Sequence, residues 1–215
     1  MHVQIGFSGP AGSGVNSSGL RLADLLSDHG YAIRADKEFA SVIKGENNCF
    51  FLSISDQEEY FLSKKVDFFV AFDDYAITKN QDLYDLQNSI NISKISAKHK
   101  NTFAFGAMLS ILNISLEVGE EYFKKLIKEE LRVENLPDLG AGYEYGSNLC
   151  ENDDKYHTTF MLQKIAEPKE IKYGNQLVAQ GAMQSGLSFY SAYPMTPASS
   201  IADTILEHPE VTFFQ

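Results

Sequence analysis

The chain alternates strand-like and helix-like segments from its first residues, and this pattern constrains the fold more than any other feature. Apolar residues 3–7 end in a glycine-rich turn, residues 15–26 carry apolar side chains at helical spacing, and Gly30 follows as a helix stop. Strands separated by helices predict an α/β domain whose mostly parallel sheet has helices on both faces. The predicted strands are residues 3–7, 31–35, 50–54, 66–72 and 90–95.

Two helices are predicted after this sheet, at residues 103–112 and 117–131. The first carries small residues that suit close packing, and the second is amphipathic, with Glu and Lys in i,i+4 relation on its polar side. Residues 136–152 contain a proline and several glycines, so we expect an irregular segment there. A short helix is expected over residues 156–164.

The run Glu167-Pro168-Lys169 is a predicted linker, which gives one domain at residues 1–166 and another at 167–215. The second domain restarts the alternation. Two strands and two helices cannot cover their own sheet, so we expect this domain to be the incomplete start of a larger α/β domain. Its predicted helices are residues 175–186 and 198–206, and its predicted strands are 189–192 and 211–214.

Composition excludes several classes of function. The 215 residues are 44% hydrophobic and 22% charged, as in globular proteins. The net charge of -11 repels phosphate backbones and anionic lipid, so we expect no nucleic acid and no membrane as a partner. Cys49, Cys150 and the five histidines lack metal-ligand spacing, so no metal or iron–sulfur site is expected within this chain. Scarce cysteine and the lack of a leader before residue 3 predict a cytoplasmic protein.

The first candidate site is the turn Gly9-Pro10-Ala11-Gly12-Ser13-Gly14 between the first strand and the first helix. Such a turn lets a ligand approach the backbone and directs N–H groups of the helix start toward an anion. The spacing differs from the dinucleotide fingerprint, and no Walker lysine is present, although Asp36 follows the second strand where Rossmann domains carry a ribose-binding acid. A tight turn that needs glycine for its dihedral angles explains the same residues.

The second candidate is the stretch from Glu38 to Asn47. Lys44 and Gly45 in this stretch could form a basic turn that faces a ligand. A solvated turn explains the same residues, and both interpretations stay open.

The third candidate is the loop Ser191-Ala192-Tyr193-Pro194-Met195-Thr196-Pro197-Ala198-Ser199-Ser200. Tyr193 and Thr196 each precede a proline, which favours extended backbone and a stiff loop that fixes the direction of the Thr196 hydroxyl. The loop follows a predicted strand at its carboxyl end, where open α/β sheets bind ligands. A helix start with Thr196 as N-cap and Pro197 as first helical residue is a compatible alternative.

These motifs together resemble the 2-oxoacid:ferredoxin oxidoreductases. The glycine turn through Val15, followed by the run from Glu38 to Gly45, is similar to the gamma domain of these enzymes, with Ser13 in place of the usual Gln and Lys44 in place of the usual Arg. The run from Tyr193 to Ser199 is similar to the opening of the alpha-subunit pyrimidine-binding domain, as are Gly174-Asn175, Gly181-Ala182 and Gly186. A gamma domain fused ahead of alpha resembles the 2-oxoglutarate and general 2-oxoacid enzymes.

The resemblance implies oxidative decarboxylation of a 2-oxoacid to acyl-CoA, with electrons passed to ferredoxin. The implied cofactors of the assembled enzyme are thiamine diphosphate with Mg, an iron–sulfur (4Fe-4S) cluster and coenzyme A. A partner beta subunit would hold the thiamine phosphates and the cluster. In the family, the acid that activates the thiamine ring lies soon after the position of Gln215, so this chain alone is expected to be inactive.

By carry-over from the family, Thr196 is the candidate catalytic residue and hydrogen-bonds the substrate. Two alternatives stay open: a nucleotide- or coenzyme-binding module built on the glycine turn, and a non-catalytic assembly fragment. The implied substrate-binding residues are Tyr193, Pro194, Thr196, Pro197 and Ser199, and the candidate cofactor-binding residues are Gly9, Gly12, Ser13, Gly14 and Lys44.

Overall fold

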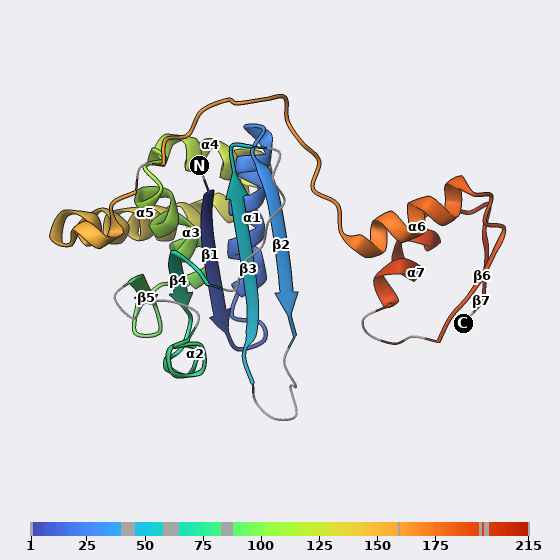
Figure 1. Cartoon of the computed structure of the whole chain (residues 1–215), viewed down its shortest axis with the longest axis horizontal. Coiled ribbons are helices and arrows are strands. Elements are labelled where there is room, and N and C mark those ends of the chain that lie inside the picture. The colour runs from blue at the N-terminus through green and yellow to red at the C-terminus, as the bar shows by residue number, and fades with distance from the viewer. Residues whose placement is uncertain are drawn as a thin grey trace. The chain divides into compact units, whose positions relative to one another are not determined.

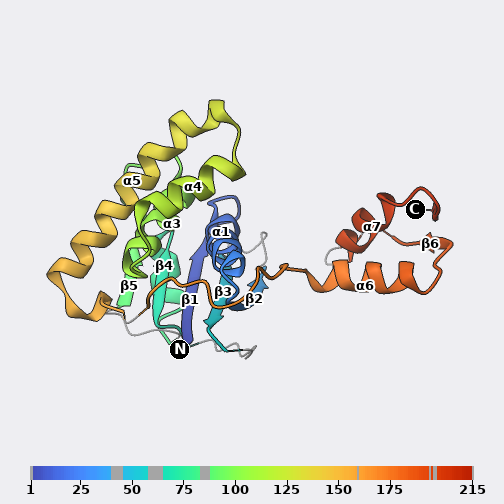
Figure 2. The same ribbon diagram turned by 90° about the horizontal axis from the view of Figure 1, so that it is seen from above.

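The computed structural model describes residues 2–39, 46–57, 65–82, 88–158, 160–193, 195 and 198–214. The chain divides into two compact units, Met1–Lys169 and Glu170–Gln215, called unit 1 and unit 2 below (Figures 1 and 2). Each unit has its own sheet. Among the described helices, none is long and apolar enough to cross a membrane.

A five-stranded sheet forms the centre of unit 1, in the order β2-β3-β1-β4-β5 (Figure 1). Neighbours β1–β4 and β4–β5 are parallel, whereas β3 is antiparallel to both β1 and β2. Among the described strands of this sheet, β3 alone therefore runs against the others, and the predicted mostly parallel α/β sheet is confirmed. The bounds are β1 (His2–Gly9), β2 (Ala32–Glu38), β3 (Asn48–Ser55), β4 (Phe68–Ala71) and β5 (Ser89–Asn91).

Helices α1 (Val15–Asp28) and α3 (Lys100–Ile111) lie on one face of this sheet (Figure 2). The helical spacing read from residues 15–26 is confirmed, because α1 turns its buried residues, among them Leu22 and Leu26, toward the sheet. The predicted stop is also confirmed, since Gly30 has a φ of 86° just after the helix. Most of α3 is buried on all sides, which explains its small side chains.

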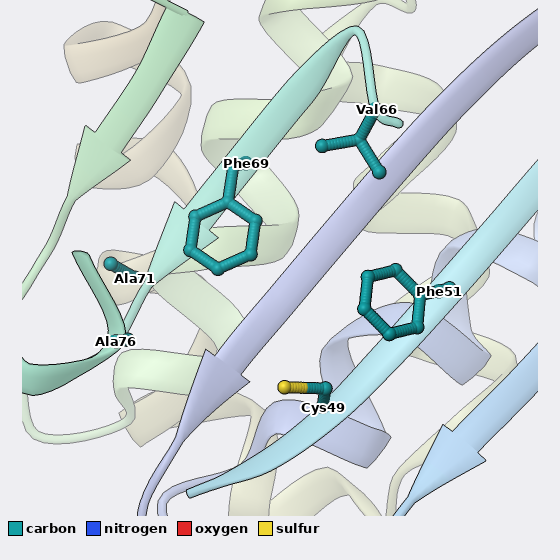
Figure 3. Packing of buried hydrophobic residues seen from close by; sticks show 6 residues of the cluster. All are labelled: Cys49, Phe51, Val66, Phe69, Ala71 and Ala76. Carbon is teal, nitrogen blue, oxygen red and sulfur yellow. The ribbon is translucent and has the colours of Figure 1, made fainter. Parts of the chain in front are cut away.

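A second apolar cluster lies on the opposite face of the sheet. Figure 3 shows side chains of β3 and β4 that point away from the helices behind them. The short helix α2 (Asp74–Lys79) packs here through Ala76 and Ile77. Gly6 of β1 makes room for this layer, because an added Cβ would lie 2.8 Å from the Phe69 ring. The buried members are Cys49, Phe51, Val66, Phe69, Ala71 and Ala76.

The expectation of an irregular segment over residues 136–152 is wrong. These residues belong to α5 (Glu129–Asn152), a helix of 24 residues that contains Pro137. Its glycines serve packing: an added Cβ would lie 2.1 Å from Phe103 O at Gly142 and 2.5 Å from Ala107 O at Gly146. The glycines thus let α5 approach the backbone of α3, so they mark a helix contact and not a loop.

Two other predicted helices differ from the structure. Helix α4 (Leu116–Leu126) stops before residue 131, because Ile127 has extended backbone with φ -118° and ψ 147°. The expected helix over residues 156–164 is wrong, since the 3-10 turn η3 (Asp154–Tyr156) ends at its first residue and residues 157, 158 and 160–164 have no helix. Backbone groups beyond η3 bond to the ends of α1 and α3 instead, as with Ile165 N and His29 O at 3.0 Å.

Unit 2 contains the elements that its sequence predicts, in the predicted order. Strands β6 and β7 are parallel, and its small core consists of Ala179, Ile205 and Val211. Large apolar side chains such as Leu177, Phe189 and Phe214 are exposed. The elements are α6 (Gly174–Gln184), β6 (Phe189–Ser191), α7 (Ser199–Leu206) and β7 (Thr212–Phe214).

Candidate functional site

The strand register brings the first two candidate stretches to one edge of the sheet. Gly9, the last residue of β1, pairs with Asn48, and Glu38 at the end of β2 pairs with Cys49. Ala71 at the end of β4 pairs with Ser8. The glycine turn therefore lies at the same edge as the ends of the stretch from Glu38 to Asn47, where open α/β sheets bind ligands.

Packing explains two glycines of the turn, and backbone geometry explains the third. An added Cβ at Gly9 would lie 2.5 Å from Phe72 Cβ, and one at Gly14 would lie 2.4 Å from Asn101 Cβ. Gly12 has a φ of 82° but open space around it, with nothing within 4 Å of an added Cβ. Gly12 thus provides the left-handed backbone conformation that the turn needs, and it leaves the backbone there accessible to a ligand.

The start of α1 leaves polar groups available beside this turn. Gly14 is the N-cap, and no side chain caps the helix. The hydroxyls of Ser17 and Ser18 donate to Gly14 O, and the Ser17 hydroxyl accepts from Asn101 Nδ2 at 3.1 Å. Within the described part of the chain, the buried atoms Ser13 Oγ and Asn16 Oδ1 have no hydrogen-bond partner. Free N–H groups and the positive end of the helix dipole make this position suitable for an anion.

A buried polar network that the sequence analysis missed lies at the same edge. Ser8 Oγ accepts from Cys49 Sγ and from Asn80 Nδ2, both at 3.3 Å. Asn47 Nδ2 donates to Asp73 Oδ1 at 2.6 Å, which fixes the last residue of the second candidate stretch to the segment after β4. Asp73 also caps α2 by accepting from Ala76 N, a role that its position after an apolar strand could have indicated.

A carboxylate adds negative charge to this edge. Asp74 Oδ1 accepts from Asn91 Nδ2 at 2.8 Å and from Ser93 Oγ at 3.1 Å. These hydrogen bonds hold the pKa of Asp74 below its ordinary value, so it is charged at neutral pH. An anionic ligand is therefore favoured at the start of α1 and disfavoured at the start of α2.

Asp36 does not take the place of a Rossmann ribose-binding acid. In a Rossmann sheet the second strand lies next to the first, whereas here β3 lies between β2 and β1. The Asp36 side chain accepts from Lys37 N at 2.9 Å. Lys44 lies outside the described residues.

The third candidate loop follows the carboxyl end of β6. Tyr193 is 80% exposed and Ser199 is also exposed, whereas Pro194, Thr196 and Pro197 lie outside the described residues. A hollow of about 100 Å³ adjoins the loop. It is lined by Ala192, Tyr193, Ala198, Ser199, Ala202, Asp203, Leu206 and Phe213.

The start of α7 adjoins this loop. Helix α7 begins at Ser199 with Ala198 as its N-cap and no side-chain cap, and the alternative of Thr196 as N-cap with Pro197 as first helical residue lies outside the described residues. The amides of Ala198 and Ser199 donate to Met195 O at 2.8 and 3.1 Å. Asn175 Nδ2 donates to Ser200 Oγ at 2.7 Å and ties α6 to this helix start.

In the described ranges, no group of three or more His, Cys, Asp or Glu side chains could hold a metal ion. Unit 1 thus offers a glycine turn with an open helix start. Unit 2, by itself, offers an exposed loop beside a small hollow.

A model of the family described as pyruvate ferredoxin/flavodoxin oxidoreductase matches residues 4–89. The matched range includes the glycine turn, the stretch from Glu38 to Asn47 and most of the sheet. The first two candidate stretches therefore lie in the part of the chain that is similar to this family.

Similarity to oxidoreductase subunits extends beyond residues 4–89. The chain is 24% identical over 265 residues to 2-oxoacid:ferredoxin oxidoreductase 1, subunit alpha, of Sulfurisphaera tokodaii, with 94% of this chain and 42% of the relative covered. A 37-residue match, 17% of the chain and 6% of the relative, is 46% identical to the indolepyruvate oxidoreductase subunit IorA of Archaeoglobus fulgidus. The chain thus spans less than half the length of the first relative.

The solved structure of 2-oxoglutarate:ferredoxin oxidoreductase from Magnetococcus marinus, with 2-oxoglutarate, coenzyme A and succinyl-CoA bound, is similar across the whole chain. The match covers 100% of this chain and 43% of that chain, with a TM-score of 0.74 and 25% identity. The predicted resemblance to the N-terminal portion of an oxidoreductase alpha subunit is confirmed.

Proposed function

We propose that this chain forms the N-terminal part of the alpha subunit of a thiamine-diphosphate-dependent 2-oxoacid:ferredoxin oxidoreductase. The reaction is oxidative decarboxylation of a 2-oxoacid to acyl-CoA, with electrons passed to ferredoxin. The observation that carries the proposal is the match of both units, and not only of the family domain, to an enzyme of this kind. Because the chain spans less than half of that enzyme's chain, it provides only one side of the active site.

In this proposal, the two predicted domains have separate roles. Residues 1–166 are the gamma-type domain, and residues 167–215 open the pyrimidine-binding domain. Thiamine diphosphate supplies the electron sink for decarboxylation when it is bound. A partner beta subunit holds its phosphates with Mg, together with the 4Fe-4S cluster. Neither Cys49 nor Cys150 forms a disulfide, which fits a cytoplasmic enzyme.

The Tyr193–Pro197 loop is the proposed substrate side of the site. Thr196 donates its hydroxyl to the 2-oxoacid, and Pro194 and Pro197 restrict the backbone on either side of it. Tyr193 and Ser199 flank it as contact residues. The high exposure of Tyr193 leaves it available to a substrate or to further polypeptide.

The glycine turn is the proposed site for an anionic part of coenzyme A. The uncapped start of α1 and the accessible backbone at Gly12 support this role. Gly9 and Gly14 hold the turn against Phe72 and Asn101, Ser13 contributes its unpartnered hydroxyl, and Lys44 adds a cation from the second stretch.

The two substitutions Gly12→Asp and Gly12→Asn test the coenzyme site as a matched pair. Both residues tolerate the left-handed backbone of position 12, but only aspartate places negative charge beside the bound anion. We expect Gly12→Asp to weaken coenzyme A binding at least about tenfold and Gly12→Asn to stay within about threefold of the wild type. Titration calorimetry measures this, with NAD and ATP as competing ligands. Equal affinities of the two variants would remove the turn from coenzyme binding.

Activity of the assembled enzyme tests the proposed function itself. The complete alpha subunit, co-expressed with a thiamine-binding beta subunit, is expected to reduce ferredoxin when given a 2-oxoacid and coenzyme A. A panel of 2-oxoacids, including 2-oxoglutarate and pyruvate, identifies the substrate. A complex that binds coenzyme A without 2-oxoacid-dependent reduction of ferredoxin would favour the alternative of a coenzyme-binding module. A complex with neither property would favour an assembly fragment.

A further inference from the structure

Residues 160–169 have no helix or strand, yet they are fastened to the body of unit 1 along the C-terminal end of α1 (Figure 1). Ile165 N donates to His29 O, and Lys169 N donates to Ser27 O, both at 3.0 Å. Ser27 Oγ, on a residue that is 2% exposed, donates back to Lys169 O. The segment thus uses carbonyl groups at the end of α1, which a helix terminus leaves available.

Tyr31 provides a second anchor for the same segment. Its hydroxyl donates to Met161 O at 3.1 Å and accepts from Gln163 N at 3.2 Å. The Tyr31 ring lies 5.5 Å from the ring of Phe160, and each residue is 1% exposed. A buried hydroxyl is costly when unpaired, and here the segment supplies both of its partners.

Gly30 allows the segment to lie directly on the backbone after α1. Its φ is 86°, and an added Cβ would lie 2.6 Å from Ala166 N and 2.7 Å from Ala166 O. Both contacts are to main-chain atoms, so no side-chain rotation could relieve them. Ser27, Gly30 and Tyr31 therefore form one continuous surface against which residues 160–169 pack.

We propose that residues 160–169 act as a clamp that fastens the start of the connection between the two units to the end of α1. The free part of the connection is then residues 170–173, which span at most about 14 Å when extended. The clamp lies at the opposite end of α1 from the glycine turn. It keeps the free part of the connection this short, whatever ligand the glycine turn binds.

Hydrogen exchange of the complete protein, followed by mass spectrometry, tests the clamp. We expect amides of residues 160–169 to exchange at least about tenfold more slowly than those of residues 170–173. Tyr31→Phe removes the hydroxyl, and Gly30→Ala introduces the clash. Each is expected to accelerate exchange over residues 160–169 by about tenfold or more, while α3 and β1 keep their protection.

Two matched substitutions serve as controls. Tyr75→Phe changes an exposed tyrosine of α2, and Gly140→Ala changes a glycine with open space around it. Both are expected to leave exchange over residues 160–169 unchanged. The clamp is refuted if wild-type residues 160–169 exchange as fast as residues 170–173, or if Tyr31→Phe and Gly30→Ala leave their rate unchanged. Acceleration throughout unit 1 in both variants would also refute it, because the segment would then not open separately.

Discussion

Gly142→Ala is expected to lower the free energy of unfolding of unit 1 by about 1–3 kcal/mol. The added Cβ would lie 2.1 Å from Phe103 O and 2.8 Å from Phe103 C, which are backbone atoms of α3. This clash can be relieved only if α5 moves away from α3. That movement also loosens the contacts of Gly106 with Leu139 and of Gly146 with Ala107. The gain of about 1 kcal/mol that alanine brings to a helix interior is too small to offset this loss.

Gly140→Ala is the control on the same helix, two residues away. An added Cβ at Gly140 meets nothing within 4 Å, so the helix propensity of alanine acts alone. We expect this variant to gain about 0.5–1 kcal/mol. Urea denaturation measures both changes at equilibrium. Similar destabilisation by the two substitutions would mean that α3 and α5 do not pack as closely as described.

Thr196→Ala is expected to lower kcat of the assembled oxidoreductase about a hundredfold. The substitution removes the hydroxyl that, in the proposed function, donates to the 2-oxoacid near its reacting carbon. Pro197 restricts the preceding residue in the same way in the variant and in the wild type, so we expect the loss to come from the missing hydroxyl. Steady-state reduction of ferredoxin at saturating 2-oxoacid and coenzyme A gives kcat.

Thr196→Ser and Thr204→Ala provide the comparison. Serine keeps the hydroxyl and is expected to retain kcat within about tenfold. Thr204 lies on α7, where its hydroxyl bonds Ser200 O at 3.1 Å within the helix, so its loss is expected to leave turnover unchanged. Wild-type turnover in Thr196→Ala would exclude Thr196 from the reaction.

The sheet of unit 1 is predictable from the sequence because its strands are short apolar runs between turns. Helix α1 is equally clear, since its apolar residues repeat at the helical period and Gly30 ends it. The position of β3 between β2 and β1 is not predictable in this way. Strand order depends on contacts between distant segments, and local periodicity carries no information about them.

Helix α5 shows where a prediction from local composition fails. Pro137 and the glycines are typical of loops when judged by local propensity. In the structure, Gly142 and Gly146 face α3 at a spacing of one helical turn. Glycines that repeat every four residues, next to a second segment of small residues, are therefore a signal for close helix packing.

The candidate site was only partly accessible to sequence reasoning. The glycine turn could be located, because glycine is needed wherever φ is positive, as at Gly12 and Gly14. The hydrogen bond between Asn47 and Asp73 could not be predicted, since it joins two segments that are distant in the sequence. The N-cap of α7, Ala198, carries no signal in the sequence, because alanine is a poor N-cap by propensity.

The position of β1 in the middle of the sheet has a consequence for biosynthesis. Ile5 pairs with Leu52 on one side and Phe68 on the other, so β1 is synthesised before both of its neighbours and pairs only after they follow. The hairpin of β2 and β3 closes a shorter loop and can form before β1 is enclosed. Until β4 emerges, the apolar side chains of Val3, Ile5 and Phe7 stay open to other nascent chains and to chaperones.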